Sequence, residues 1–171
     1  VNNVGVSMRG KFADLNPDVY KTILDSNILS AVYPSIPAIQ HLRATKGSLI
    51  FISSLPAIRG LPGMSAYCSA KMALRGIAES IRIEESKNHI HVGLMYVGYT
   101  EIDDGKETIF ADGTKKLLEP RKGRGAQTKE FVAKAVARNI SKRHFLTVLT
   151  PIGKINLFLQ SILPMLVERI L

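Results

Sequence analysis

The 171-residue sequence contains a single cysteine, Cys68, and no tryptophan, and only 6% of its residues are aromatic. A lone cysteine cannot form an intrachain disulfide, so nothing indicates an oxidising compartment and we expect a cytoplasmic protein. The first residues have no initiator methionine and no basic segment followed by an apolar one, which argues against a secretory signal. We therefore expect a fragment that begins inside a domain.

Positive charge exceeds negative charge, because 23 lysines and arginines against 14 aspartates and glutamates give a formal net charge of +9. The basic residues are spread along the chain, with short clusters at 115–116, 121–124 and 142–144. Aromatic residues do not alternate with these clusters, as a base-stacking surface would require. We expect a solvated basic surface and no nucleic-acid partner.

Helical and strand-like patterns alternate over residues 1–150, which predicts an α/β fold with a parallel sheet covered by helices. The first helix should begin after Asn16, a good N-cap residue followed by Pro17, and be kinked at Pro34 and Pro37. The expected elements are a strand end at 1–5, a helix at 16–41, a strand at 47–54, a helix at 66–85, a strand at 91–97, a helix at 127–143 and a strand at 145–149.

Two segments do not fit this alternation. Residues 98–126 are polar, charged and glycine-bearing, and a connection of this length is usually a lid or a binding loop, so we expect it to be mobile without ligand. Residues 151–171 form an apolar C-terminal extension, which Gln160, Ser161 and Pro164 interrupt too often for a membrane span of about 20 apolar residues. Packing on the domain or on a second subunit is the first expectation for it, and a helix lying on a membrane surface is the second.

Tyr67 and Lys71 carry the clearest chemical signal, because residues four apart are neighbours on one face of a helix. A nearby ammonium favours phenolate and lowers the pKa of a phenol, ordinarily about 10, toward the range of a general acid/base. Ser54 ends a buried strand one loop before Tyr67, and ligands of parallel α/β sheets sit at such strand ends. Asn27 lies inside the first predicted helix, although asparagine is a poor helix former.

Other candidate residues carry weaker signals. His89 and His91 fall on one strand face, but no third ligand stands at metal-binding spacing, so no metal site is expected. Cys68 points away from its neighbour Tyr67 on a helix and is expected to be a small packing residue. The acidic residues at 101–104 are expected to form a solvated turn.

The four residues Asn27, Ser54, Tyr67 and Lys71 resemble, in type and separation, the Asn-Ser-Tyr-Lys tetrad of the classical short-chain dehydrogenase/reductase family. The opening Asn-Asn-Val-Gly at 2–5 is similar to the Asn-Asn-Ala-Gly that ends the family's fourth strand. The resemblance covers nearly all of residues 1–149 but only the C-terminal part of the family domain. It implies a Rossmann-type, doubly wound parallel sheet of which this chain holds strands four to seven.

The sequence departs from the family in two places. After the sixth strand the family has Pro-Gly and a later threonine, whereas here Val97 replaces the proline and Thr100 comes early. The glycine-rich Gly-x-x-x-Gly-x-Gly turn that holds phosphates in the family is absent from the chain. The cofactor-binding residues that the resemblance implies are Asn3, Val4, Gly5, Tyr67, Lys71, Val97, Gly98 and Thr100, with NAD or NADP as cofactor.

The resemblance implies hydride transfer between a nicotinamide and a carbonyl or alcohol substrate, with Tyr67 as general acid/base. Lys71 would hold the nicotinamide ribose, Ser54 would hydrogen-bond the substrate oxygen, and Asn27 would position a water that links Lys71 to solvent. The family also implies a homo-oligomer. An epimerase or dehydratase on the same scaffold and a noncatalytic cofactor-sensing or scaffold protein are the alternatives. We expect the 171 residues alone to be inactive.

Overall fold

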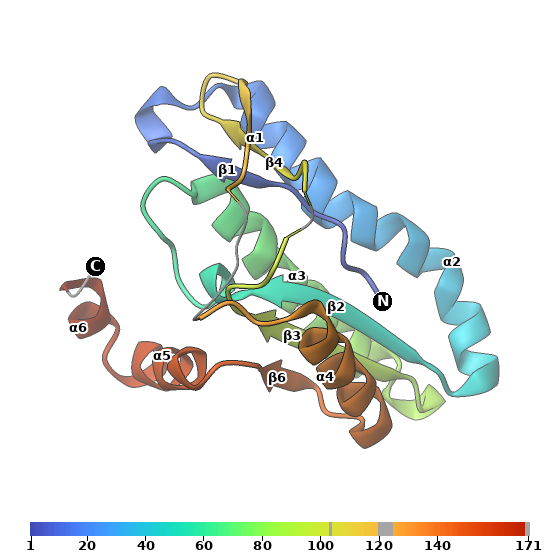
Figure 1. The fold of residues 1–171 in the computed structure, drawn as a ribbon. Helices are drawn as coiled ribbons and strands as arrows, with labels where there is room; N and C mark the ends of the chain where they lie inside the picture. Colours follow the sequence, from blue (N-terminus) through green and yellow to red (C-terminus); the bar gives the residue numbers. More distant parts are fainter. Residues whose placement is uncertain (103, 120–124, 170–171) are drawn as a thin grey trace.

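The structure, a computed structural model, describes residues 1–102, 104–119 and 125–169 (Figure 1). Asp103 and the basic cluster at 121–124 lie outside the described residues. The rest of the chain is an α/β fold, as the sequence predicts, with two three-stranded sheets and helices on both faces of the larger one.

The larger sheet consists of three parallel strands in the order β2 (Ser48–Ser54), β3 (His91–Val97) and β6 (Leu146–Val148). Asn2 extends this order beyond β2 through a parallel bridge to Phe51. The Asn2 amide donates to the Ile50 carbonyl (2.7 Å), and the Ile52 amide donates to the Asn2 carbonyl (2.9 Å). The chain thus holds a strand stub and three parallel strands in the order expected for strands four to seven.

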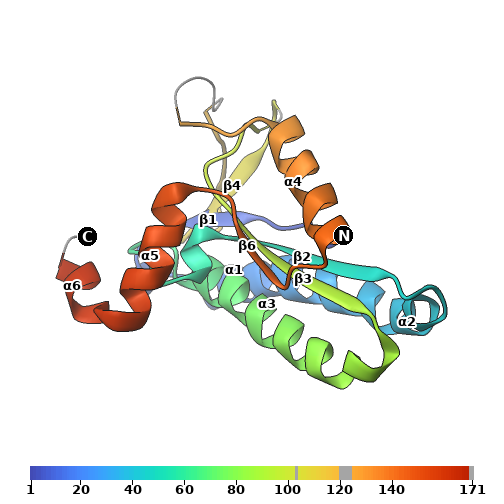
Figure 2. The same cartoon turned by 90° about the horizontal axis from the view of Figure 1, so that it is seen from below.

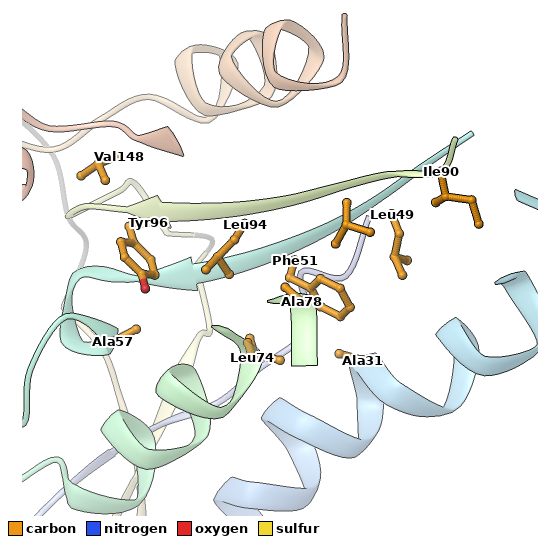
Figure 3. Close-up of a cluster of buried hydrophobic side chains, with 11 residues drawn as sticks. Ala31, Leu49, Phe51, Ala57, Leu74, Ala78, Ile90, Leu94, Tyr96 and Val148 are labelled. Atoms are coloured by element: carbon orange, nitrogen blue, oxygen red, sulfur yellow. The ribbon is translucent and has the colours of Figure 1, made fainter. Parts of the chain in front are cut away.

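Helices cover both faces of this sheet, because both faces are apolar. In Figure 2, α2 (Ser30–Thr45) and α3 (Ser65–Glu84) lie on one side, and α4 (Lys129–Lys142) lies on the other. Alternate residues of β2 point to opposite faces, so Phe51 packs toward Leu74 of α3 (Figure 3), whereas Ile50 packs toward α4. Full burial of one such side chain stabilises the fold by about 1.5–3 kcal/mol.

The first helical segment is longer than the sequence predicts and is not uniform. It begins as α1 (Pro17–Leu24), capped by the Asn16 side chain, and continues through a π-helical turn (Asp25–Leu29) into α2. It ends at Thr45 and not at residue 41 as predicted. The next residue, Lys46, takes a left-handed conformation with φ 49°. Its two prolines lie inside α2.

Residues 98–126, which the sequence leads us to expect as a mobile lid or binding loop, contain two strands in their central part. A second sheet has the order β1 (Ser7–Arg9), β4 (Glu107–Phe110) and β5 (Lys115–Leu117), with β1 and β4 parallel and β4 and β5 antiparallel. We refer to residues 107–117 as the hairpin. Its turn forms because Gly113 adopts φ 90° and the Asp112 carboxylate accepts a hydrogen bond from the Thr114 amide (2.9 Å).

The C-terminal residues form two short helices, α5 (Pro151–Ile162) and α6 (Pro164–Arg169), beside the carboxyl end of β6 (Figure 1). The Thr150 hydroxyl caps α5 by accepting a hydrogen bond from the Gly153 amide (3.0 Å). Among the described residues, no helix has the length and apolar character to cross a membrane. Single 3-10 turns occupy Phe12–Asp14, Leu55–Ala57 and Ser86–Asn88.

Candidate active site

A cavity of about 600 Å³ opens at the carboxyl ends of β2 and β3. The two strands end in register, with Ser54 opposite Val97, so the residues that follow both strands meet at one edge of the sheet. The cavity is lined by most of the site residues predicted from the sequence, namely Asn3, Gly5, Ser54, Tyr67, Lys71, Val97, Gly98 and Thr100.

Lys71 lies in the second turn of α3 and is only 5% exposed. Two hydrogen bonds tie it to the end of β2: its Nζ donates to the Ile52 carbonyl (3.2 Å), and its carbonyl accepts from the Ser53 hydroxyl (3.0 Å). Burial, and secondarily the positive charge of Lys106, lowers its pKa to about 8. The amine is therefore held at the cavity wall and is still mostly protonated at pH 7.

Tyr67 lies one turn before Lys71 on the same face of α3, with the Lys71 Nζ 5.7 Å from its ring centre. This distance is within the range of a cation–π contact. The half-buried ring packs against an apolar cluster to which β1 contributes Met8 and the hairpin contributes Ile109. The second sheet therefore supports the side chain that the sequence predicts as general acid/base.

Ser54 is the last residue of β2 and is half-buried at the cavity wall. The next three residues, Leu55–Ala57, form a 3-10 turn that includes a proline at its start. Ser54 is therefore placed where the strand stops and the 3-10 turn begins.

Asn27 is fully buried in the π-helical turn and does not line the cavity. Its Nδ2 donates to the carbonyls of Val6 and Ile23, both at 2.9 Å, whereas its Oδ1 has no hydrogen-bond partner among the described residues. A Cβ on Gly5 would lie 2.2 Å from this oxygen and 3.2 Å from the Lys71 Nζ. The missing side chain of Gly5 thus leaves the space into which both Asn27 and Lys71 project.

Val4, like Asn27, is a predicted site residue that does not line the main cavity. It is 68% exposed and borders a second cavity of about 360 Å³ beside Pro34 and Ser35 of α2. The alternation of an extended chain accounts for this placement, because Asn3 and Gly5 on either side of Val4 line the main cavity.

Of the weaker candidates, Cys68 and His91 occupy packing positions. His89 does not share a strand face with His91, because it precedes β3, is exposed and has φ 58°. Cys68 is buried, its sulfur accepts a hydrogen bond from the Leu61 amide (3.4 Å), and burial raises the pKa of its thiol. The buried His91 ring makes contacts of 3.0 Å with the Ser48 hydroxyl and with the His144 carbonyl. Burial lowers the pKa of His91, so the ring is neutral at pH 7.

The sequence does not predict that three charged residues line the cavity, namely Glu101, Lys106 and Lys129. Glu101 Oε2 accepts a hydrogen bond from the Lys129 amide (3.4 Å) at the start of α4. Lys106 precedes the hairpin. The Asp112–Gly113 pair, a common hairpin turn, is the sequence signal that indicates the second sheet and with it the position of Lys106.

The comparisons with known proteins agree with this geometry. The family model of the short chain dehydrogenases matches residues 1–112, and the chain belongs to this family. The 3-dehydrosphinganine reductase of Danio rerio is 32% identical over 158 residues, which is 90% of this chain and 46% of that protein. The 3-ketodihydrosphingosine reductase of Bos taurus is 31% identical over 154 residues, 85% of this chain and 44% of that protein. The chain thus spans less than half the length of these two relatives.

Solved structures share the fold. A short chain dehydrogenase from Burkholderia cenocepacia, crystallised with NADP, superposes with a TM-score of 0.79 over 98% of this chain and 65% of its own, at 13% identity. A short-chain dehydrogenase from Streptomyces avermitilis gives a TM-score of 0.76 over 98% of this chain and 66% of its own, at 18% identity. At such low identities the likeness concerns the fold alone.

Proposed function

We propose that the protein is an NAD(P)-dependent oxidoreductase that interconverts a carbonyl and an alcohol, with Tyr67 as general acid/base. The observation that carries this proposal is the convergence of Ser54, Tyr67 and Lys71 on one cavity at the carboxyl edge of the sheet. Membership in the short chain dehydrogenase family supports it. Hydroxyl, phenol and ammonium together can hydrogen-bond a carbonyl oxygen and move a proton to it.

Each of these side chains has a distinct task in the proposed reaction. In the reducing direction the Tyr67 hydroxyl donates a proton to the substrate oxygen, and in oxidation it accepts one. The Ser54 hydroxyl hydrogen-bonds the same oxygen and orients it. The Lys71 ammonium, 5.7 Å from the Tyr67 ring centre, favours the charged form of the phenol. Asn27 Oδ1, buried without a partner among the described residues, accepts a hydrogen bond from a water on the path between Lys71 and solvent.

The cavity suits a nicotinamide nucleotide, which supplies or accepts the hydride when bound. Within the described part of the chain Lys71 donates one hydrogen bond, so two of its three protons are available for ribose hydroxyls. Gly5 and Gly98 also line the cavity, and their missing side chains make room for Asn27 and Thr150. Asn3, Val97 and Thr100 complete this wall, whereas Val4 lies outside it. Titration with NADH and with NADPH decides between NAD and NADP.

A long-chain keto compound is the substrate class that we propose to test first. The supporting observation is the similarity, at 32% and 31% identity, to proteins named 3-dehydrosphinganine reductase and 3-ketodihydrosphingosine reductase. The assay follows NADPH or NADH oxidation by the full-length protein with 3-ketodihydrosphingosine and with short, water-soluble ketones. Turnover with any ketone supports the oxidoreductase, whereas cofactor binding without turnover across the panel would favour the noncatalytic alternative.

The apolar C-terminal helices support a further proposal, that the protein contacts a lipid surface at its periphery. One face of α5 and the start of α6 carry exposed apolar side chains: Ile152, Ile155, Phe158, Ile162, Leu163 and Met165. A helix with such a face lies in a membrane interface instead of crossing it. Flotation with phosphatidylcholine vesicles tests this, with Ile155→Asp/Phe158→Asp as the variant. Equal flotation of the variant would contradict the contact.

Self-association is the remaining proposal, and it is supported by the exposed apolar residues Tyr33 and Ile36 on α2. Analytical ultracentrifugation of the full-length protein and of Tyr33→Glu/Ile36→Glu tests it. A monomer for both proteins would contradict a homo-oligomer.

A further inference from the structure

The lining of the cavity is rich in basic residues. The charged residues that line it within the described part of the chain are Lys71, Lys106, Lys129 and Glu101, and Lys129 takes part in a further interaction. The single carboxylate is already engaged, because Glu101 Oε2 accepts the Lys129 amide hydrogen. That amide belongs to the N-terminus of the 14-residue helix α4, whose dipole adds further positive potential.

The hairpin fixes the backbone of Lys106 at the lining of the cavity. Its carbonyl accepts a hydrogen bond from the Leu118 amide (2.8 Å), which closes the base of the hairpin. The hairpin is fixed to β1 by the Thr108 hydroxyl, which donates to the Ser7 carbonyl (3.0 Å), and at its tip the Ala111 carbonyl accepts from the Asn16 amide (2.9 Å). The backbone of Lys106 is therefore held in place, and its side chain is exposed.

We propose that Lys106 is a specificity-determining residue, whose ammonium binds an anionic phosphate or carboxylate group of the molecule that occupies the cavity. This inference rests on the proposed function and adds to the four predicted catalytic residues one that directly precedes the hairpin. The anionic group comes either from the dinucleotide or from the substrate, and the two sources present the same chemistry to an ammonium.

The electrostatics of Lys71 support this assignment. Besides burial, the charge of Lys106 lowers the pKa of Lys71, so the two ammonium groups repel each other through the cavity. An anion bound by Lys106 removes this repulsion and raises the pKa of Lys71. Tyr67, Glu101 and Lys129 also face the cavity, and they are present with and without the anion.

The test compares Lys106→Ala and Lys106→Arg with Lys115→Ala in the full-length protein. Lys115 is an exposed lysine on β5 of the same hairpin that does not line the cavity, so it controls for net charge and for hairpin stability. Isothermal titration with NADPH, NADH and inorganic pyrophosphate measures the Kd, and steady-state assays measure the KM of the ketone substrate. We expect Lys106→Ala to weaken binding of the anionic ligand by about fivefold, as for a partly exposed charge pair, with most of the affinity restored in Lys106→Arg.

The pattern of the loss identifies the source of the anion. Weaker NADPH, NADH and pyrophosphate binding with an unchanged substrate KM assigns the group to the dinucleotide, and the reverse pattern assigns it to the substrate. Equal Kd and KM values for Lys106→Ala and Lys115→Ala would overturn the proposal. Because the titrations need no turnover, a loss of affinity in Lys106→Ala supports Lys106 even if Tyr67 fails as the general acid/base.

Discussion

The Lys71 Nζ and the side-chain Oδ1 of Asn27 both lie close to the position that a side chain on Gly5 would occupy. A Cβ at residue 5 would be 2.2 Å from the asparagine oxygen and 3.2 Å from the ammonium nitrogen. Two residues far apart in the sequence thus share the space that the missing side chain of Gly5 leaves. This relationship connects a buried polar residue of the π-helical turn to the wall of the cavity.

Gly5→Ala is expected to destabilise the fold by about 2 kcal/mol or more, because the added methyl group overlaps a buried side chain. NADPH affinity should also fall, because Lys71 is displaced. Gly76→Ala in α3 is the matched control: a Cβ there meets nothing within 4 Å, and alanine in a helix should raise stability by up to about 1 kcal/mol. Urea unfolding measures both, and equal effects of the two changes would contradict the close approach at Gly5.

Asn27→Asp is expected to lower the free energy of unfolding by about 2–3 kcal/mol, because a carboxylate would replace the Nδ2 group that donates to two buried carbonyls. Asn16→Asp makes the same chemical change at the N-cap of α1, where aspartate caps equally well, and should be nearly neutral. Thermal unfolding of both variants at pH 7 checks this. A near-neutral Asn27→Asp would show that the amide donors are not needed.

Lys71→Met should raise stability at neutral pH while abolishing function. In the folded state the pKa of Lys71 falls from 10.5 to about 8, which corresponds to a cost of about 3 kcal/mol at pH 7 for burying the charge. The unfolded chain binds more protons between pH 8 and pH 10.5, so the stability of the unsubstituted protein rises across this window. The advantage of Lys71→Met is therefore full below pH 8 and shrinks toward pH 10.5.

Urea unfolding at pH 7 and at pH 10 measures this difference, with Lys115→Met as an exposed control. The same advantage at both pH values, or none at pH 7, would contradict a buried ammonium at residue 71.

Amide hydrogen exchange should be slower in the hairpin than in the residues that precede it. The Phe110 and Leu118 amides donate to the Thr114 and Lys106 carbonyls, so we expect them to exchange slowly with or without NADPH. Residues 98–102, which border the cavity without belonging to a strand, should gain protection when NADPH binds. Rapid exchange across the hairpin without ligand would contradict the second sheet.

The sequence predicts the central sheet well and the second sheet not at all. Strands β2 and β3 are apolar on both faces, and this pattern marks their bounds to within one residue. The hairpin strands are short, and β5 begins with Lys115 and Lys116, so neither shows a local strand pattern. They exist because Thr108 pairs with Ser7, a contact between residues about a hundred positions apart that no local pattern reports.

In the candidate site, too, local patterns predict some residues, whereas tertiary contacts position the others. Tyr67 and Lys71 are neighbours on one helix, and Ser54 ends a strand, so local patterns and the family resemblance predict that they meet. The position of Lys106 depends on the pairing of the hairpin with β1, and the approach of both Asn27 and Lys71 to Gly5 depends on the missing side chain there. Both are tertiary contacts, which sequence periodicity does not encode.

The most direct test of the account compares Tyr67→Phe with Tyr20→Phe, each of which removes one phenol oxygen. The Tyr20 hydroxyl donates to the Ser69 hydroxyl (3.1 Å) at the surface and does not border the cavity. Single-turnover and steady-state rates are measured with the best ketone substrate, and NADPH affinity is measured by titration. We expect Tyr67→Phe to lower kcat at least about a hundredfold with little change in the NADPH Kd, and Tyr20→Phe to change neither. A Tyr67→Phe protein that keeps most of its rate would contradict the assignment of Tyr67 as general acid/base.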